Sequence, residues 1–237
     1  MNYIENIIEP KKLLLAWQSK IDTPEGRTRR FVAEIIRTND NATLRYLIET
    51  KDFDEAVKHG FNGYPAFKKD CKVHDNVLDI FKQRIPQRTR PDFGTYLDSL
   101  RIKKATLVSD FALLGYSEAK LPEDGFSLLI PFEDQSPPFE FIAEVAGFRY
   151  SEGMQRISEL VPGLRLLLEA EPKNEFDPMA IKILTEDTKI NIGYINRMQT
   201  PAFHKWIQNN SIADPIIERI NGTIQKPKVF MYIKVRP

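Results

Sequence analysis

Hydrophobic and polar positions alternate through much of the second half of the chain. Met179, Ile181 and Ile183 stand at every second position after a loop rich in turn-forming residues, which predicts a strand. Comparable runs predict a set of short strands, at residues 140–148, 164–170, 180–184, 190–195, 215–224 and 228–235. Helical insertions are expected at 151–160 and 200–208. Short, closely spaced strands with one helix predict a small, partly open barrel or a sandwich.

The first half of the chain mixes strand-like and helix-like patterns. Two β-rich segments, 31–37 and 43–49, flank an Asn/Asp turn, which predicts a hairpin. Residues 7–17 fit either a short helix or a strand, and the charged interval 22–30 predicts an exposed basic loop. The remaining expected elements are a helix at 52–59, a helix from Asp75 to about Arg84, a helix capped by Asp92, a short helix at 110–115 and a strand at 126–131.

The clearest break in the pattern is the polar run at 133–138, which ends in a pair of prolines. Such a run resists both helix and sheet, so we place a domain boundary there. The predicted fold class is α+β. It combines a mixed strand and helix module at 1–135 with a β-rich module at 139–237.

Composition narrows the class of protein without identifying a partner. The chain has 237 residues, of which 42% are hydrophobic and 28% charged, as is typical of a folded soluble protein. The formal net charge of +1 gives no overall attraction to a polyanion, so any basic surface must be local. Cys71 is the only cysteine, which excludes internal disulfides and cysteine-based zinc modules. No apolar run approaches the ~20 residues that span a bilayer, and the start lacks a secretory signal, so we expect a cytoplasmic protein without a membrane partner.

The sequence contains no motif for a nucleotide or a resident cofactor. Neither a Gly-x-Gly-x-x-Gly turn nor a Gly-Lys-Ser/Thr loop is present. His59, His74 and His204 are far apart in the sequence and lack cysteine partners, so surface histidines are a simpler interpretation than a metal site.

One pattern is compatible with catalysis. Asp110, Glu118 and Lys120 are the residue types that bind Mg²⁺ and orient a water molecule in metal-dependent nucleases. Because three such common residues often arise by chance, a solvated turn is the favoured interpretation. We therefore expect no enzyme, and a metal-dependent nuclease stays as an alternative.

Basic residues concentrate in two segments. Residues 220–237 hold four Lys/Arg and no acid, with Phe230 and Tyr232 between them. Single-stranded nucleic acid is gripped by cations that follow phosphates and rings that stack on bases, so Lys228 and Phe230 are candidate contacts. An edge strand protected from aggregation by lysines is an equal alternative. Residues 82–104 carry seven Lys/Arg against two acids, which indicates either a phosphate-contacting face or the solvated side of two helices.

Three clusters in the second half combine rings, cations and acids, at 146–150, 171–183 and 191–197. Phe176 and Tyr150 are candidate base-stacking rings. The alternative is structural, with both rings in the core, Asp177 capping a turn and Asn174 serving a tight turn. The residues alone leave both interpretations open.

The three clusters, in this order, resemble the HIRAN domain, a small β module. The resemblance covers about residues 139–237 and rests on Val145-Ala-Gly-Phe-Arg149-Tyr150, Gly163-x-x-Leu166-Leu167, Glu171-Pro-x-Asn174-x-x-Asp177-x-x-Ala180-Ile-x-Ile183 and Ile192-Gly-Tyr-Ile-x-Arg197. It implies an OB-like β barrel that captures the 3′ end of single-stranded DNA. The implied DNA-binding set is Arg149, Tyr150, Asn174, Phe176, Asp177, Tyr194 and Arg197, to which Lys228 and Phe230 of the basic end segment are added, with no catalytic residue, metal or cofactor.

The resemblance also implies a role for each residue. Arg149 and Tyr150 form one wall of the pocket, and Phe176 stacks on a terminal base. Asp177 accepts a hydrogen bond from the terminal 3′-hydroxyl. Because a carboxylate is repelled by an internal phosphate, it selects an end over a continuous strand.

Further roles come with departures from the best understood member of the family. Asn174 is expected to hold the loop or a nucleotide, and Arg197 to contact a phosphate. Phe176 stands where that member has a tyrosine, so stacking is kept but a hydroxyl is lost. Tyr194 stands where it has a histidine.

A fainter resemblance links residues 1–135 to the N-terminal region of HipA-type toxin kinases. It rests on Phe31-Val-Ala-Glu-Ile35, Val77-Leu-Asp-Ile-Phe81, Arg84-Ile-Pro86, Leu113-Leu-Gly115 and a Leu-Leu-Ile-Pro131 strand. No kinase catalytic motif follows, so it implies a docking or regulatory piece.

Two functional hypotheses follow. The first is a non-enzymatic protein of DNA repair, DNA processing or defence, which binds single-stranded DNA at 3′ ends and a partner protein through its first half. The second is a regulatory protein of a HipA-type toxin–antitoxin system, which acts through protein contacts.

Overall fold

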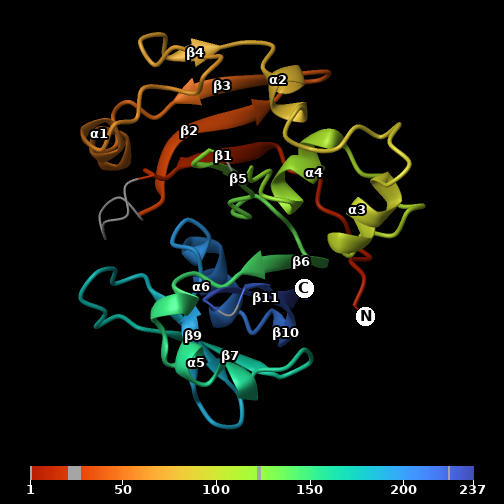
Figure 1. The fold of residues 1–237 in the computed structure, drawn as a ribbon, viewed down its shortest axis with the longest axis vertical. Helices are drawn as coiled ribbons and strands as arrows, with labels where there is room; N and C mark the ends of the chain where they lie inside the picture. The colour runs from red at the N-terminus through yellow and green to blue at the C-terminus, as the bar shows by residue number, and fades with distance from the viewer. Residues whose placement is uncertain (1, 21–27, 122–123, 224) are drawn as a thin grey trace. The chain divides into compact units, whose positions relative to one another are not determined.

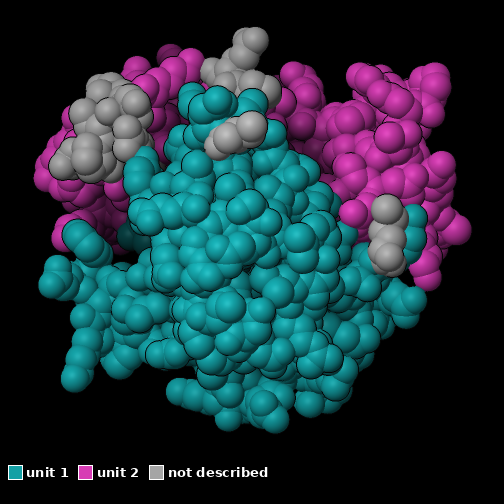
Figure 2. All heavy atoms as spheres, turned by 60° about the horizontal axis from the view of Figure 1, so that its bottom comes forward, with its two compact units in different colours: residues 1–7, 132–237 teal, residues 8–131 magenta. Residues whose placement is uncertain are grey.

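The computed structural model describes residues 2–20, 28–121, 124–223 and 225–237. They form two compact units, which Figure 2 distinguishes by colour. Residues 8–131 make the five-stranded unit, and residues 132–237 together with residues 1–7 make the two-sheet unit. The predicted basic loop at 22–30 lies mostly outside the described residues.

The five-stranded unit is built on one antiparallel sheet in the order β4-β3-β2-β1-β5 (Figure 1). Its strands are β1 (Lys12–Trp17), β2 (Arg30–Arg37), β3 (Ala42–Tyr46), β4 (Val73–His74) and β5 (Phe126–Leu129). The central residues of β1 are buried without alternation, so both faces of this strand are covered. The segment that fitted either a helix or a strand is thus a strand. The predicted hairpin is confirmed as β2 and β3, and Thr38 N–H closes its turn by donating to Asn41 O (2.9 Å).

The helices of this unit are α1 (Lys51–Lys58), α2 (Leu78–Lys82), α3 (Phe93–Ser99) and α4 (Asp110–Tyr116). The predicted helix from Asp75 to Arg84 is shorter than expected, because Asp75 does not cap it. The Asp75 carboxylate accepts from the Thr43 hydroxyl (2.8 Å), and Asn41 Oδ1 accepts from Leu78 N–H (3.1 Å).

Arg84 is buried, and its guanidinium is held by its own unit. It makes a two-pronged ion pair with Asp124 (2.7 and 2.9 Å) and donates to the carbonyls of Ala119 (2.8 Å) and Phe126 (3.2 Å). Two further arginines of the 82–104 run also pair with carboxylates of this unit. The interpretation of this run as a phosphate-contacting face is therefore wrong for Arg84.

The two-sheet unit contains two antiparallel sheets of three strands each, in the orders β10-β11-β6 and β7-β8-β9. Their strands are β6 (Phe139–Glu144), β7 (Leu166–Ala170), β8 (Ile181–Thr185), β9 (Asn191–Tyr194), β10 (Ile212–Thr223) and β11 (Lys226–Val235). The helical elements are η1 (Phe148–Tyr150), α5 (Glu152–Gln155), η2 (Ile157–Glu159) and α6 (Thr200–Gln208). The predicted range of α6 is confirmed.

The two sheets meet at two seams, and a single bridge holds each seam. Ala146 pairs with Tyr194 at one seam, and Arg165 pairs with Ile216 at the other. Across the described residues, the strands therefore do not close into a continuous barrel, and the predicted OB-like barrel is not confirmed. At the first seam the ladder cannot continue, because Gly147 turns the chain away with a φ of +72° and begins η1.

Residues 1–7 join the two-sheet unit through Glu140, whose side chain is fully buried. Its carboxylate accepts from the backbone N–H groups of Glu5 (3.1 Å) and Asn6 (2.8 Å) and lies 3.2 Å from Lys234 Nζ. Burial raises the pKa of Glu140, but the hydrogen bonds from Asn6, Lys234 and Glu5 outweigh it and hold the pKa below its ordinary value of 4.5. The predicted domain boundary had assigned residues 1–7 to the module at 1–135.

No helix in the described part of the chain is both long enough and apolar enough to span a membrane.

Candidate nucleic-acid interface

The loop between β7 and β8 is ordered by its own polar groups. Asn174 Oδ1 accepts from the N–H groups of both Phe176 (3.0 Å) and Asp177 (3.0 Å). The Asp177 carboxylate accepts in turn from Met179 N–H (2.9 Å). The predicted turn roles of Asn174 and Asp177 are therefore both found, and the loop has a defined shape without packing against a core.

The two candidate stacking rings point into solvent. Phe176 is 95% exposed and Tyr150 is 67% exposed. The interpretation of both rings as core residues is therefore wrong. Phe176 comes from the β7–β8 loop, which projects beyond the strands (Figure 1), and Tyr150 ends η1.

The three sequence clusters meet at one seam of the two-sheet unit. Ala146 and Tyr194 exchange backbone hydrogen bonds of 2.9 Å each, which joins the first cluster to the third. Gly193 permits this approach, because a Cβ there would lie 2.4 Å from Ala146 O. The Tyr194 hydroxyl donates to Glu171 Oε2 (3.1 Å), which joins the third cluster to the second.

Two further contacts hold the loop to the rest of its unit, and neither was predicted from the sequence. Glu171 Oε1 accepts from Lys182 Nζ on β8 (2.6 Å), and this ammonium, followed by the Asn174 amide, holds the pKa of Glu171 below its ordinary value. His204 Nε2 on α6 lies 3.0 Å from Met179 O, where it can only donate. The spacing of Glu171, Asn174 and Asp177, three residues apart, was a signal for a polar turn network.

The three predicted phosphate-contacting cations are all exposed but come from separate segments of the two-sheet unit. Arg149 and Arg197 are exposed, and the Arg149 guanidinium lies 5.9 Å from the centre of the Tyr150 ring. Lys228 is exposed on β11, opposite Asn221 on β10.

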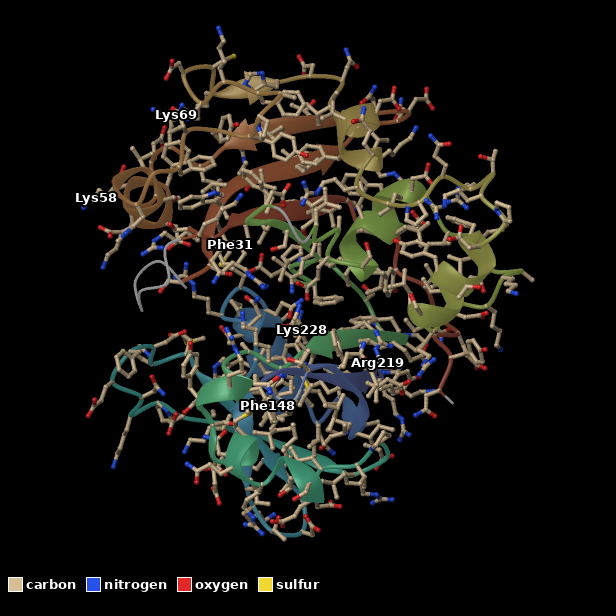
Figure 3. The ribbon with its side chains drawn as sticks, viewed as in Figure 1. Phe31, Lys58, Lys69, Phe148, Arg219 and Lys228 are labelled. Carbon is tan, nitrogen blue, oxygen red and sulfur yellow. The ribbon has the colours of Figure 1, made fainter. Side chains whose placement is uncertain are left out.

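Phe230 has less ring surface accessible for base stacking than the sequence suggested. It is half-buried, and the Arg219 guanidinium covers its ring at 4.7 Å (Figure 3 labels Arg219). One face of this ring is thus already stacked. Its strand, β11, is the centre of its sheet, so the interpretation as a protected edge strand is wrong.

The three candidate nuclease residues are not brought together as a set, because the two acids lie at opposite ends of α4. Asp110 begins α4 and pairs with Arg88 (2.7 Å), while Glu118 follows the end of α4 and pairs with Lys120 (2.7 Å). The rise of α4 from Asp110 to Tyr116, about 9 Å, lies between the two acids. Among the described residues, no group of three His, Cys, Asp or Glu side chains is arranged to hold a metal ion.

Known proteins resemble the chain in the two-sheet unit. Residues 138–234 match the family model of the HIRAN domain. The crystal structure of the HIRAN domain of human HLTF is 17% identical, covers 40% of this chain and 74% of that chain, and gives a TM-score of 0.32. A crystal structure of a protein from Lactobacillus plantarum is 20% identical, covers 41% of this chain and 99% of that chain, and also gives a TM-score of 0.32. No curated protein matches the chain.

The resemblance of the second half to this family is confirmed, while the HipA-type resemblance of residues 1–135 is not shown and stays a prediction. The match places a HIRAN domain at residues 138–234, and HIRAN domains are known as DNA-binding modules.

Proposed function

We propose that the HIRAN domain of this protein binds single-stranded DNA at its 3′ end, and that the protein acts in DNA repair, processing or defence without catalysing a reaction. The observation that carries this proposal is the exposed ring of Phe176 on a loop ordered by Asn174. Folding alone gives little reason for an ordered loop to hold a large apolar ring in water, because a ring that stays exposed contributes almost nothing to stability.

Stacking on a base gives the ring a role. Every base offers a π-face, so a rigidly presented phenyl group binds a terminal base with little dependence on sequence. Tyr150 adds a second exposed ring, with the Arg149 cation beside it.

The acids beside the ring favour an end over a continuous strand. Asp177 Oδ1 accepts from Met179 N–H, and among the described residues no hydrogen bond engages its Oδ2. A carboxylate oxygen accepts from a hydroxyl and repels a phosphate, so a strand with a free 3′-hydroxyl is preferred there. Glu175, which precedes Phe176 in the sequence, is exposed and adds a second negative charge to this loop.

Binding of the rest of the strand then depends on cations away from the loop. Arg149, Arg197 and Lys228 are exposed, and each can neutralise a phosphate. On single strands, each phosphate contact contributes about 0.7 to the slope of log affinity against log salt concentration.

The test is fluorescence anisotropy with the full chain and a 5′-labelled oligothymidine that ends in either a 3′-hydroxyl or a 3′-phosphate. The proposal predicts tighter binding of the hydroxyl form and a weaker preference for it in Asp177→Ala. Arg149→Ala should weaken both forms and lower the salt slope by about 0.7. Absence of binding to either oligonucleotide would contradict nucleic-acid binding, and equal affinity for both would contradict end recognition.

A further inference from the structure

We propose that Glu171 is the positioning residue of this site, because its carboxylate fixes the amide of Asn174 and thereby the placement of Phe176 and Asp177. Glu171 itself is not expected to touch the DNA. This inference deepens the proposed function and rests on it, since the loop matters only if it receives a strand end.

The Glu171 carboxylate is shared by three side chains from three segments. Oε2 accepts from Asn174 Nδ2 in the loop (2.7 Å) and from the Tyr194 hydroxyl on β9 (3.1 Å). Oε1 accepts from Lys182 Nζ on β8 (2.6 Å). Because Lys182 and Tyr194 are direct neighbours across the β8–β9 ladder, the carboxylate is tied to a rigid pair of strands.

The hydrogen bond to Glu171 decides which way the Asn174 amide faces. With Nδ2 donating to Glu171, Oδ1 is turned to the N–H groups of Phe176 and Asp177, and it accepts from both. The flipped amide would place an NH₂ group against two N–H donors and an oxygen against a carboxylate. Only one orientation of the Asn174 amide satisfies the Glu171 carboxylate and both N–H groups. Glu171 therefore selects the turn conformation that holds the Phe176 ring in place.

The charge of Glu171 is available for this task at neutral pH. Its pKa lies below the ordinary value, chiefly because of the Lys182 ammonium and then the Asn174 amide. The ion pair with Lys182 also compensates this charge within the site, which leaves Asp177 to act on the ligand.

Removing the carboxylate should leave the loop present but less often in its binding conformation. The apparent affinity falls in proportion to the fraction of molecules with the loop correctly formed. For Glu171→Ala we expect the affinity for the 3′-hydroxyl oligonucleotide to fall about 10-fold, with a loss of preference over the 3′-phosphate form. The salt slope should stay unchanged, because Arg149, Arg197 and Lys228 are untouched.

Two variants separate positioning from charge. Glu171→Gln removes the same charge but keeps an oxygen that accepts from Asn174, so it should retain affinity within about 3-fold of wild type. Glu186→Ala is the control: it also removes one negative charge, from an exposed acid of the β8–β9 turn, and should change neither the affinity nor the 3′-hydroxyl preference. The experiment is the anisotropy assay on these variants of the full chain, at a temperature where each remains folded. Amide hydrogen exchange of Phe176 and Asp177 is measured in parallel.

The outcomes distinguish this inference from the proposed function. If wild type binds and Glu171→Ala keeps its affinity and preference, the positioning role is wrong. It is also wrong if Glu171→Gln is as weak as Glu171→Ala, because an acceptor for Asn174 would then not restore binding. If wild type binds no DNA, the proposed function fails. Faster exchange of the two amides in Glu171→Ala would still show that Glu171 orders the loop, and unchanged exchange would contradict it.

Discussion

Replacing Phe176 by alanine should separate DNA binding from folding more cleanly than any other single change in the chain. The side chain is 95% exposed, so its removal takes almost no apolar area out of the folded interior. The free energy of unfolding should change by less than about 0.5 kcal/mol, as for other surface substitutions. A single-stranded ligand, in contrast, should lose a stacking contact worth about 1–3 kcal/mol.

At about 1.4 kcal/mol for each factor of 10, this loss corresponds to a dissociation constant raised about 5-fold to 150-fold. The assay is fluorescence anisotropy with a 5′-labelled oligothymidine bearing a 3′-hydroxyl, with urea denaturation of each variant beside it. Phe176→Trp should bind at least as tightly as wild type, because the larger ring keeps the stacking face.

Leu107→Ala supplies the matched control. Leu107 is 96% exposed, lies between α3 and α4 of the five-stranded unit, and has no place in the proposed site. Its removal should alter neither stability nor binding. A stacking role for Phe176 is contradicted if Phe176→Ala binds within about 2-fold of wild type, or if Leu107→Ala loses affinity to the same extent.

Three further changes test the fold that presents the site, each by urea denaturation followed by circular dichroism. Glu140→Gln should destabilise the two-sheet unit by about 2 kcal/mol at neutral pH. Because the folded-state pKa of Glu140 lies below 4.5, the stability that its carboxylate contributes is present above pH 4.5 and is lost as the pH falls below it. The stabilities of wild type and variant should therefore converge in acid, and a difference that stays constant with pH would contradict this. Arg84→Ala should destabilise the five-stranded unit by about 3 kcal/mol, because Asp124 loses its two-pronged partner, and a neutral result would mean that the ion pair adds nothing. Gly193→Ala should cost about 2 kcal/mol or more and also weaken DNA binding, because its Cβ meets Ala146 O at a φ of +129°; a fully stable variant would show that the seam can shift.

Periodicity was enough to predict most of the elements of the second half. The alternation that leads into β8 reflects one dominant face, so the pattern and the fold agree there. Periodicity did not predict that the seam between Ala146 and Tyr194 consists of a single bridge. The run at 140–148 continues to look like a strand past Glu144, and only the left-handed Gly147 shows that the ladder ends there.

The sequence named candidate site residues, but it did not give their arrangement. An aromatic residue such as Phe176 in an apolar pattern fits a core as well as a surface, so its exposure could only come from the structure. Glu171 was named as part of the family motif, but its contacts were not predicted, because its three donors come from separate segments. Arg84 was assigned to the surface because charge alone does not show that Asp124, 40 residues later, completes a buried pair.

The most direct measurement of the central claim is the change in backbone amide chemical shifts of the 27.5 kDa chain on titration with a short 3′-hydroxyl oligothymidine. We predict that the largest shifts fall at Arg149 and Tyr150, at Asn174 to Asp177 and at Tyr194, with smaller ones along the exposed cations. Saturable binding whose shifts leave these residues unchanged, or that appears only within residues 8–131, would contradict it.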